Sequence, residues 1–493
     1  MIEVIYRIFI KPSVLMVITG LLLFGVSVQG FIAPNEAVRM YIAKQWLAGV
    51  PLYTGIADTS QPAIFFVFAF FYSLFGKDIL ALRVMCIFAI LAAQWFIYAI
   101  ACRIHSKTSG LIAMAVFGIM MSLPDTGNGF TVRPDIFSML FYLSALYIFM
   151  LSYSARKKSH YVICMISAGF LLACALAFSQ MSVFSIAGIT ALYLSTRSND
   201  KSPYAKLSAD MLYVLGVCVI AVFCLLLMLK TQGTVLKDYI YWAWQSLYSL
   251  LPQSWYEWSK SFFFSFQRRN IAVLYPFVLL FIVVRNKLGW KLNVSGGVVM
   301  SFICELVAVA IWGLIFEFEF TRIVPLTALM AGMAVTFLIE NKNSWDLREK
   351  TALVILLVFV IGIPYGLLGK KRNQSLSVSF KPDVYKDFGK WLTQQVPEDG
   401  FLFVYGNFDS QLYVYSDRRS PTRFIGKNLT AFPHTEDKIV ADMETNRPQI
   451  IITPMIGDIP QWLDRFCRNG YKRILHNDSW IKRNFRIYRM ENR

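Results

Sequence analysis

The sequence predicts a polytopic α-helical membrane protein with a separate C-terminal α/β domain. Hydrophobic residues make up 56% of the 493 residues and charged residues only 16%, with a mean hydropathy of +0.52. Soluble domains carry about 25% charged residues, so this composition excludes a wholly soluble chain. The net charge of +18 comes from short basic clusters between apolar runs, without a basic face of interleaved aromatic residues. We therefore expect membrane orientation to explain the charge and predict no nucleic-acid partner.

Eleven apolar runs are read as membrane spans, because a helix of about 20 residues crosses a hydrocarbon core of about 30 Å. Arg7 and Lys11 precede the first run without a small-residue cleavage site, which favours an anchor over a signal peptide. Together the runs define a membrane domain over residues 1–369. They are residues 13–33, 79–102, 109–124, 134–153, 160–178, 182–195, 209–229, 271–285, 296–316, 323–340 and 350–369.

The apolar run Pro62–Phe75 decides the predicted topology, because counting it as a span inverts every later loop. At about fourteen residues it suits an interfacial or re-entrant segment better than a span. If it lies along the outer surface, the short basic clusters between later spans all fall on the cytoplasmic side, as the positive-inside rule requires. We thus predict a multi-pass protein of the inner (plasma) membrane with a cytoplasmic N-terminus and an extracytoplasmic C-terminal domain.

Three pieces are predicted outside the membrane, namely loop 34–78 with juxtamembrane helices, loop 230–270 and domain 370–493. The last alternates short β-type runs with helix-like stretches, which is typical of a small α/β unit. The β-type runs are Phe401–Tyr405, Gln411–Tyr415, Gln449–Thr453 and Phe485–Tyr488, and the helix-like stretches lie near 384–395, 435–445 and 459–469.

Glu36 is the first residue in this chain that suggests chemistry. Residues 36–48 form a plausible interfacial helix in which Glu36 lies away from the apolar face and would meet water or a cleft. A carboxylate at a low-dielectric boundary can have its pKa raised and act as a general base. Equally, a carboxylate at a helix start can simply cap the helix. The pattern leaves both interpretations open.

The order of short motifs resembles that of the GT-C class of membrane glycosyltransferases, in the branch of protein O-mannosyltransferases, lipid A aminoarabinose transferases and related bacterial enzymes. These motifs are an acidic pair after the first span, a small-residue helix end, an acid before the interfacial segment, and a basic residue with proline heading a late span. In this sequence they are Pro34-Asn35-Glu36, Leu47-Ala48-Gly49, Asp58-Thr59-Ser60-Gln61-Pro62, Leu74-Phe75-Gly76, Arg83, Pro134-Asp135 and Thr321-Arg322 with Pro325.

Two positions depart from the family pattern. The family usually has Asp where this chain has Asn35, and an amide cannot accept a proton from a hydroxyl. The usual Lys before the interfacial segment is replaced by Ser60 and Gln61, so another cation must balance a donor phosphate.

The resemblance implies transfer of a sugar from a polyprenyl-phosphate donor to a lipid, glycan or protein acceptor at the extracytoplasmic face, in cell-envelope glycan assembly or modification. It implies membrane lipids as further partners and a divalent cation as a candidate cofactor, with no protein metal site assigned. Arginine suits the donor phosphate because it offers a bidentate fork. The implied catalytic residues are Glu36, as the base for the acceptor hydroxyl, and Asp58 and Asp135, one of which could orient it or hold a divalent ion. The implied phosphate ligands are Arg322, Arg133 and Arg269.

Simpler roles compete for several of these residues. Arg133 can be a snorkelling boundary charge and Arg268-Arg269 a solvated turn, while Asp135 suits the start of a helix on dipole grounds alone. The aromatic stretch Tyr239 to Trp258 could contact a sugar or a polyprenyl chain, or only anchor the chain at an interface. Glu305 lies inside a predicted span, where it is either functional or paired with hydroxyls of a neighbouring helix.

Two other function classes stay open from the sequence. A transporter or flippase of lipid-linked sugars also needs an apolar helix bundle, although no internal repeat is visible and transporter folds usually carry one. The other is a GT-C-fold protein without transferase activity, suggested by Asn35.

Overall fold

The structure is a computed structural model, and its described residues form two compact units assembled from separate stretches of chain. Unit 1 consists of Met1–Gln29, Arg83–Leu225 and Leu251–Val378, and unit 2 of Gly30–Leu82, Leu226–Leu250 and Ser379–Arg493. The described residues are 11–27, 32–123, 129, 131–152, 157–196, 203–245, 254, 275–285, 292–312, 319–341, 351, 382–406, 410–425, 435–455 and 459–491.

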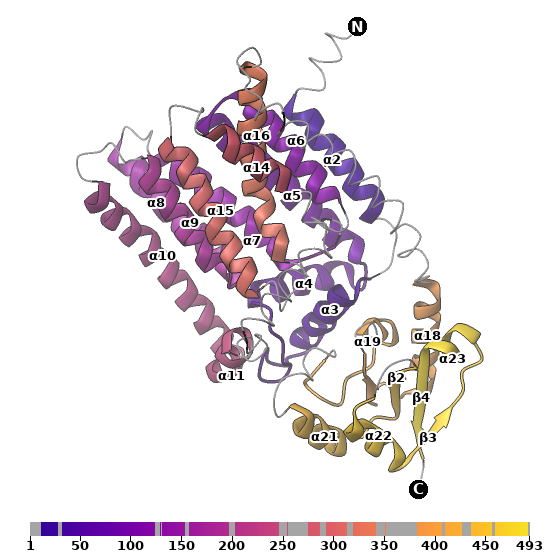
Figure 1. Cartoon of the computed structure of the whole chain (residues 1–493). Coiled ribbons are helices and arrows are strands. Elements are labelled where there is room, and N and C mark those ends of the chain that lie inside the picture. Colours follow the sequence, from indigo (N-terminus) through magenta and orange to yellow (C-terminus); the bar gives the residue numbers. More distant parts are fainter. Residues whose placement is uncertain are drawn as a thin grey trace. The chain divides into compact units, whose positions relative to one another are not determined.

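Unit 1 is a bundle of long apolar helices (Figure 1). Every predicted span from the first run to 323–340 corresponds to a helix, and the run 350–369 lies almost wholly outside the described residues. The helices are α2 (Pro12–Ser27), α5 (Ile79–Ile104), α6 (Lys107–Ser122), α7 (Pro134–Ser152), α8 (Lys158–Phe178), α9 (Ser182–Thr196), α10 (Pro203–Thr231), α14 (Tyr275–Arg285), α15 (Leu292–Trp312) and α16 (Val324–Glu340), the last preceded by the 3₁₀ turn η3 (Glu319–Ile323).

Five helices in the described part of the chain are long and apolar enough to cross a membrane. The fold class is therefore confirmed as polytopic and α-helical, while the number of eleven spans stays a prediction. The five segments are Ile79–Ile104, Pro134–Ser152, Lys158–Phe178, Asp210–Thr231 and Thr321–Glu340, and shorter apolar helices lie at Pro12–Gly25, Pro62–Phe75, Lys107–Ser122 and Gly297–Val307.

Small residues let helices of unit 1 approach each other closely, as is common between membrane helices. A Cβ atom added at Gly332 of α16 would lie 2.5 Å from the Ser109 carbonyl oxygen of α6. At Gly188 of α9 it would lie 3.3 Å from the Cβ of Ser301 in α15. The Ser301 hydroxyl also donates to the Gly188 carbonyl over 2.7 Å. The pairs α6 with α16 and α9 with α15 are thus fixed by backbone approach.

Unit 2 begins with two short helices in the region expected to hold juxtamembrane helices, α3 (Pro34–Leu47) and α4 (Pro62–Phe75). Proline occupies the first position of each helix, where its missing N–H costs no hydrogen bond. Beyond α3 the chain turns at Gly49 (φ 89°), and Gly76 (φ 62°) caps the end of α4. Helix α4 has 14 residues and so measures about 21 Å, which is short of a hydrocarbon core. The stretch Leu226–Leu250 adds α11 (Leu236–Ile240) and the π-helical turn η1 (Tyr241–Gln245).

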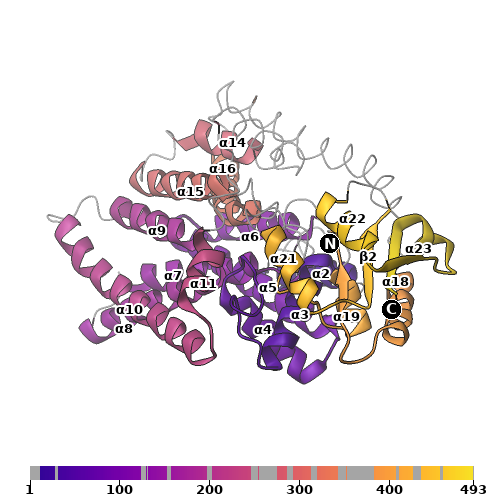
Figure 2. The same ribbon diagram turned by 90° about the horizontal axis from the view of Figure 1, so that it is seen from below.

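The C-terminal part of unit 2 carries a four-stranded sheet of order β1-β2-β4-β3 (Figures 1 and 2). Strands β1 and β2 are parallel, and the other neighbours are antiparallel. The strands are β1 (Leu402–Val404), β2 (Ile450–Pro454), β3 (Tyr471–Ile474) and β4 (Phe485–Met490), and the helices around them are α18 (Pro382–Gln395), α19 (Ser410–Ser416), α21 (Thr435–Thr445), α22 (Gln461–Arg468) and α23 (Ser479–Asn484).

Helices cover both faces of this sheet. Phe403 contacts Trp462 of α22 with ring centroids 6.4 Å apart, and Phe485 contacts Phe388 of α18 at 5.5 Å. The strand register puts Phe403 and Phe485 on opposite faces. The C-terminal region is therefore a small layered α/β unit, as predicted.

The expected strand Gln411–Tyr415 is wrong, because these residues belong to helix α19. Leu412 and Val414 alternate with Tyr413 and Tyr415 as in a strand, but the helix is buried on nearly all sides and packs on α18 and α3. A short apolar run that is buried all round has no periodicity that separates helix from strand.

Candidate functional site

The residues Leu52–Gln61, which we call the Asp58 turn, join α3 to α4 in unit 2. The Ser60 amide donates to Asp58 Oδ1 over 2.6 Å, and the Asp58 side chain is half-buried. Desolvation raises the pKa of the Asp58 carboxyl above its usual value, although the Ser60 hydrogen bonds and the charge of Arg39 oppose the shift. The turn thus holds an acid that is partly open to water and accepts a proton more readily than an ordinary aspartate.

Tyr53 fixes this turn from inside. It is 1% exposed and has a φ of 64°, a conformation that costs a bulky residue on the order of 1–2 kcal/mol. Its hydroxyl donates to the Ser60 carbonyl oxygen over 2.7 Å. Burial raises the pKa of Tyr53, so the phenol stays neutral and keeps its proton for this bond. The strained residue therefore supports the carbonyl two positions after Asp58.

The second stretch of unit 2 supports the end of the same turn. The Tyr239 hydroxyl donates to Gln61 Oε1 over 2.9 Å, and Gln61 Nε2 donates to the Ala243 carbonyl over 3.4 Å. The rings of Tyr53 and Tyr239 meet edge to face at 5.1 Å, and Trp244 donates its indole N–H to the Tyr239 hydroxyl over 3.3 Å. The described part of the aromatic stretch thus contacts the Asp58 turn. The rest of it, up to Trp258, lies outside the described residues apart from Ser254.

Glu36 is 0% exposed, so the expectation that it faces water or a cleft is wrong. It occupies the third position of α3, and its Oε2 accepts a hydrogen bond from the Ala33 amide over 2.9 Å. This is the carboxylate half of a capping box, the simpler of the two roles that the sequence left open. Asn35 beside it is exposed.

In unit 1 the structure brings Arg133 and Asp135 together at the start of α7. Arg133 Nε donates to Asp135 Oδ1 over 3.0 Å and Nη2 to Oδ2 over 2.5 Å, a bidentate pair that is 5–6% exposed. Arg133 Nη2 also donates to the Thr321 hydroxyl of η3 over 2.8 Å. Arg133 therefore does not snorkel outward as a lone boundary charge, because a buried carboxylate neutralises it.

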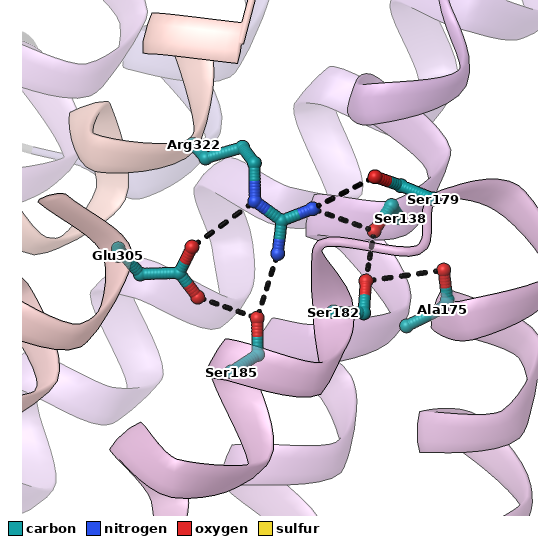
Figure 3. A network of polar contacts seen from close by, with 7 residues as sticks. All are labelled: Ser138, Ala175, Ser179, Ser182, Ser185, Glu305 and Arg322. Atoms are coloured by element: carbon teal, nitrogen blue, oxygen red, sulfur yellow. Dashed lines mark hydrogen bonds and ion pairs between the residues drawn. The ribbon is translucent and has the colours of Figure 1, made fainter. Parts of the chain in front are cut away.

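Arg322, the next residue of η3, forms a second buried pair with Glu305 of α15 (Figure 3). Arg322 Nε donates to Glu305 Oε2 over 3.0 Å, and the Ser185 hydroxyl donates to Glu305 Oε1 over 2.5 Å. The sequence had offered either a functional role or hydroxyl pairing for Glu305. In the structure Glu305 accepts from the Ser185 hydroxyl, and it also pairs with Arg322, a partner that was not predicted for it.

Four serines complete this network. Arg322 Nη2 donates to the Ser185 hydroxyl over 2.8 Å, and Nη1 donates to those of Ser138 and Ser179, each over 3.3 Å. The Ser182 hydroxyl donates to the Ala175 carbonyl over 3.1 Å, so in the 2.6 Å contact between Ser138 and Ser182 the donor is Ser138. Each guanidinium nitrogen of Arg322 thus donates to a described acceptor.

Both arginine pairs lie at one end of the helices of unit 1. Asp135 begins α7, Ser179 follows α8, Ser182 begins α9, and η3 leads into α16. At this same end Arg83 of α5 donates to the Ser27 carbonyl at the end of α2 over 2.9 Å. The hydrogen bond from Arg133 to Thr321, the residue before Arg322, links the two ion pairs, which we call the arginine cluster.

The predicted site residues therefore fall into two groups. Glu36 and Asp58 belong to unit 2, while Arg133, Asp135 and Arg322 belong to unit 1. Arg269, like Arg268, lies outside the described residues. Sequence reasoning missed Tyr53 and the serines around Arg322, which belong to no quoted motif. It named Ser60 and Gln61 in place of the family Lys but gave Gln61 no role.

Within the described ranges, no group of three or more His, Cys, Asp or Glu side chains is placed to hold a metal ion. The divalent cation implied by the resemblance stays a prediction.

A family model described as dolichyl-phosphate-mannose-protein mannosyltransferase matches residues 59–228, from the residue after Asp58 into α10. A crystal structure of ArnT from Cupriavidus metallidurans bound to undecaprenyl phosphate has a similar fold, with a TM-score of 0.62, 13% identity and 97% of both chains covered. The chain shares the fold of ArnT. The predicted resemblance is thus confirmed.

Two further structures support this fold assignment. The apo state of the same ArnT matches with a TM-score of 0.60 and 12% identity, again over 97% of both chains. The oligosaccharyltransferase AglB from Archaeoglobus fulgidus, in complex with an inhibitory peptide and a dolichol-phosphate, matches with a TM-score of 0.54 and 11% identity over 95% of this chain and 74% of that one. No curated protein sequence matches this chain significantly.

Proposed function

We propose that this protein is a GT-C glycosyltransferase that moves a sugar from a polyprenyl-phosphate donor to an acceptor hydroxyl at the extracytoplasmic face of the inner membrane, in cell-envelope glycan assembly or modification. The observation that carries the proposal is Asp58, a half-buried carboxyl whose pKa is raised and which a well-supported turn holds in place. The ligands named for the related structures, undecaprenyl phosphate and a dolichol-phosphate, support a lipid-phosphate donor.

In the proposed reaction Asp58 takes the proton of the acceptor hydroxyl as that oxygen attacks the anomeric carbon. The bond from this carbon to the phosphate oxygen breaks, and polyprenyl phosphate leaves with the electron pair. The leaving phosphate needs cations rather than an acid. The other two proposed acids support the site. Glu36 fixes the start of α3, and Asp135 holds Arg133 in place.

Arg322, Arg133 and Arg269 are the proposed phosphate ligands. Arg322 and Arg133 already face Glu305 and Asp135, so a phosphate has to compete with these carboxylates. We expect Arg322→Ala to raise the donor concentration needed for half-maximal rate while leaving the acceptor requirement nearly unchanged. A donor requirement equal to that of the unchanged protein would remove Arg322 from the phosphate site.

The proposal is tested by incubating the purified, reconstituted protein with labelled polyprenyl-phosphate sugars and a panel of lipid, glycan and peptide acceptors. Label transferred to an acceptor by the unchanged protein, and lost in Asp58→Asn, supports a transferase with Asp58 as base. If label stays on the polyprenyl lipid with every acceptor and sugar in the panel, the transferase proposal fails. A reporter fused after residue 493 tests the orientation, which a cytoplasmic signal would contradict.

One observation favours the rival function of a lipid-linked sugar carrier. Two buried ion pairs inside a helix bundle, Arg322 with Glu305 and Arg133 with Asp135, are the kind of groups that carriers place along a transport path. A carrier would move labelled lipid across proteoliposomes without any transfer to acceptor. The same vesicles can therefore decide between the two functions.

A further inference from the structure

Asp417 lies between two lysines of unit 2. Its carboxylate bonds Lys44 in the last turn of α3 and lies 3.3 Å from Lys77, the residue after Gly76 at the end of α4. Partial burial works against the charged form, but the hydrogen bond and charge of Lys44, with the charge of Lys77, hold the pKa of Asp417 below its usual value. One carboxylate of the C-terminal domain thus joins the ends of both helices that flank the Asp58 turn.

The backbone at Asp417 fits this role. It has a φ of 61°, the left-handed region that few residues other than Gly, Asn and Asp adopt readily. This residue directly follows α19 and turns the chain into the extended stretch that follows. We call residues 410–424 the strap.

The strap follows α3 along its length. At the start of α3, Ser410 donates to the Pro34 carbonyl over 3.2 Å and Gln411 donates to the Ile32 carbonyl. Near the middle of the helix the Ser420 amide donates to the Tyr41 hydroxyl over 2.8 Å. Together with the bond from Lys44 to Asp417, these contacts hold α3 at both ends and at its centre.

The end of the strap reaches the Asp58 turn itself. The Ala57 amide donates to the Arg423 carbonyl over 2.9 Å, and Ala57 forms a parallel β-bridge with Phe424. The Arg423 guanidinium donates to the Thr54 carbonyl over 3.2 Å. The residue directly before Asp58 is therefore bonded to the C-terminal domain.

We infer that Asp417 is a positioning residue, which fixes the strap against α3 and α4 and so holds the Asp58 carboxyl in its half-buried place. The inference rests on the proposed function, because it gives the C-terminal domain a task in the transfer step. The Asp417 carboxylate bonds the two lysines, so in this inference it acts through the turn. Lys44 and Lys77 are the positive charges that balance Asp417. Neither lysine belongs to the family motifs, so no role could be assigned to them from the sequence.

Asp417→Asn is the decisive variant, because Asn keeps the size and the left-handed backbone and removes only the charge. We expect kcat to fall about threefold to tenfold with little change in the two KM values, since a small misplacement of a reacting group slows the chemical step. The looser turn exposes Asp58, so the acidic limb of the pH profile should move to lower pH. Asp417→Glu should restore part of kcat.

Asp387→Asn is the matched control. Asp387 is also an ion-paired aspartate of the C-terminal domain, 3.2 Å from Lys390, but it is far more exposed and lies on α18 outside the strap. It should leave both kcat and the pH profile unchanged. Lys44→Met combined with Lys77→Met should lower kcat as Asp417→Asn does, and the triple variant should be no slower, because all three changes remove one interaction.

Hydrogen exchange of residues 52–61 gives a readout that needs no transfer assay. Asp417→Asn should speed exchange there about tenfold, and salt should speed it in the unchanged protein but not in the variant, because half-exposed ion pairs are screened. Unchanged exchange and unchanged kcat would overturn the inference. A lower melting temperature with an unmoved pH profile would leave Asp417 with a stabilising role only and would also overturn it. Failure of the proposed function is a separate result, in which the protein without any substitution transfers no sugar.

Discussion

In unit 1 the arginine cluster pairs each of two arginines with a carboxylate, whereas in unit 2 the Asp58 turn holds a carboxyl that burial pushes towards its neutral form. Arg322 and Arg133 each meet a carboxylate within 3.0 Å, and each also donates to at least one hydroxyl. Asp58 instead accepts the Ser60 amide and feels Arg39 only as a nearby charge. Both regions are buried or half-buried, so the difference lies in how each group is paired.

This difference indicates what each region is built for. A buried ion pair holds its two partners tightly, because removing either one leaves an uncompensated charge. An acid with a raised pKa is poorly suited to holding structure, but it accepts a proton more readily than an ordinary aspartate. We therefore expect changes in the arginine cluster to act first on stability and changes in the Asp58 turn to act first on rate.

Asp58→Asn should show the largest effect. Asn keeps the oxygen that accepts the Ser60 amide but cannot take a proton, so transfer should fall about 10²- to 10⁴-fold. Because the folded state disfavours the charged carboxylate, its ionisation costs stability at any pH above the raised pKa, and the variant should be as stable as the unchanged protein or more so. Single-turnover transfer and thermal denaturation at pH 7.5 measure the two quantities.

Asp78→Asn is the control for this change. Asp78 is an exposed aspartate of unit 2 whose Oδ1 accepts the Leu80 amide over 2.8 Å, a bond that Asn can also accept. It should transfer at the unchanged rate. If Asp58→Asn loses stability instead of rate, the contrast between the two regions disappears.

Glu305→Gln should show the opposite pattern. Gln has nearly the same shape, but it leaves Arg322 buried without its carboxylate, which should cost about 3–5 kcal/mol of stability. The double variant with Arg322→Met should recover much of this loss, since it removes the uncompensated charge. Denaturation in detergent at pH 7.5 measures both.

Asp464→Asn gives the scale for an exposed pair. It breaks the bond of Asp464 to Arg468, 2.6 Å long and largely solvent-exposed, and should cost less than about 1 kcal/mol. Equal losses in Glu305→Gln and Asp464→Asn would show that the arginine cluster does not stabilise unit 1.

Glu36 allows a sharper test of the same comparison, because it is buried like Glu305 but lies in unit 2. Gln retains the oxygen that accepts the Ala33 amide, so Glu36→Gln should keep stability, while Glu36→Ala should lose about 1 kcal/mol. Glu36 and Arg39 are neighbours on α3. Glu36→Gln removes a negative charge one helical turn from Arg39, whose charge lowers the pKa of Asp58. We therefore expect the pKa of Asp58 to fall and transfer to slow about threefold.

The measurement is the pH dependence of kcat alongside thermal denaturation. If the Glu36 charge acts on Asp58, the acidic limb of the Glu36→Gln profile should move to lower pH. If Glu36 only caps α3, the limb should stay in place. A 100-fold loss in Glu36→Gln with an unmoved melting temperature would transfer the role of base from Asp58 to Glu36.

The sequence allowed the helices and the C-terminal α/β unit to be predicted, because apolar length and strand alternation are local signals. It also allowed Asp58, Asp135 and Arg322 to be named from short motifs. The pairing of Arg322 with Glu305 and the support of Asp58 by Arg423 could not be predicted, since these contacts join residues 17 and more than 360 positions apart. The helix at Ser410–Ser416 was missed because its burial comes entirely from tertiary packing.

Tyr53→Phe should give the smallest effect and tests whether the support of the Asp58 turn matters for rate. The change removes one hydroxyl, so the Ser60 carbonyl loses a 2.7 Å bond worth about 1 kcal/mol, and the ring contacts with Tyr239 and Phe65 remain. We expect kcat to fall about twofold and the melting temperature to drop slightly, with Tyr72→Phe on α4 as an unaffected control. The strained backbone at Tyr53 makes the comparison informative, because a conformation that costs stability is retained only where something else depends on it. If Tyr53→Phe lowered stability but left kcat and its pH dependence untouched, the Tyr53 hydroxyl would support the fold of the turn without contributing to the rate.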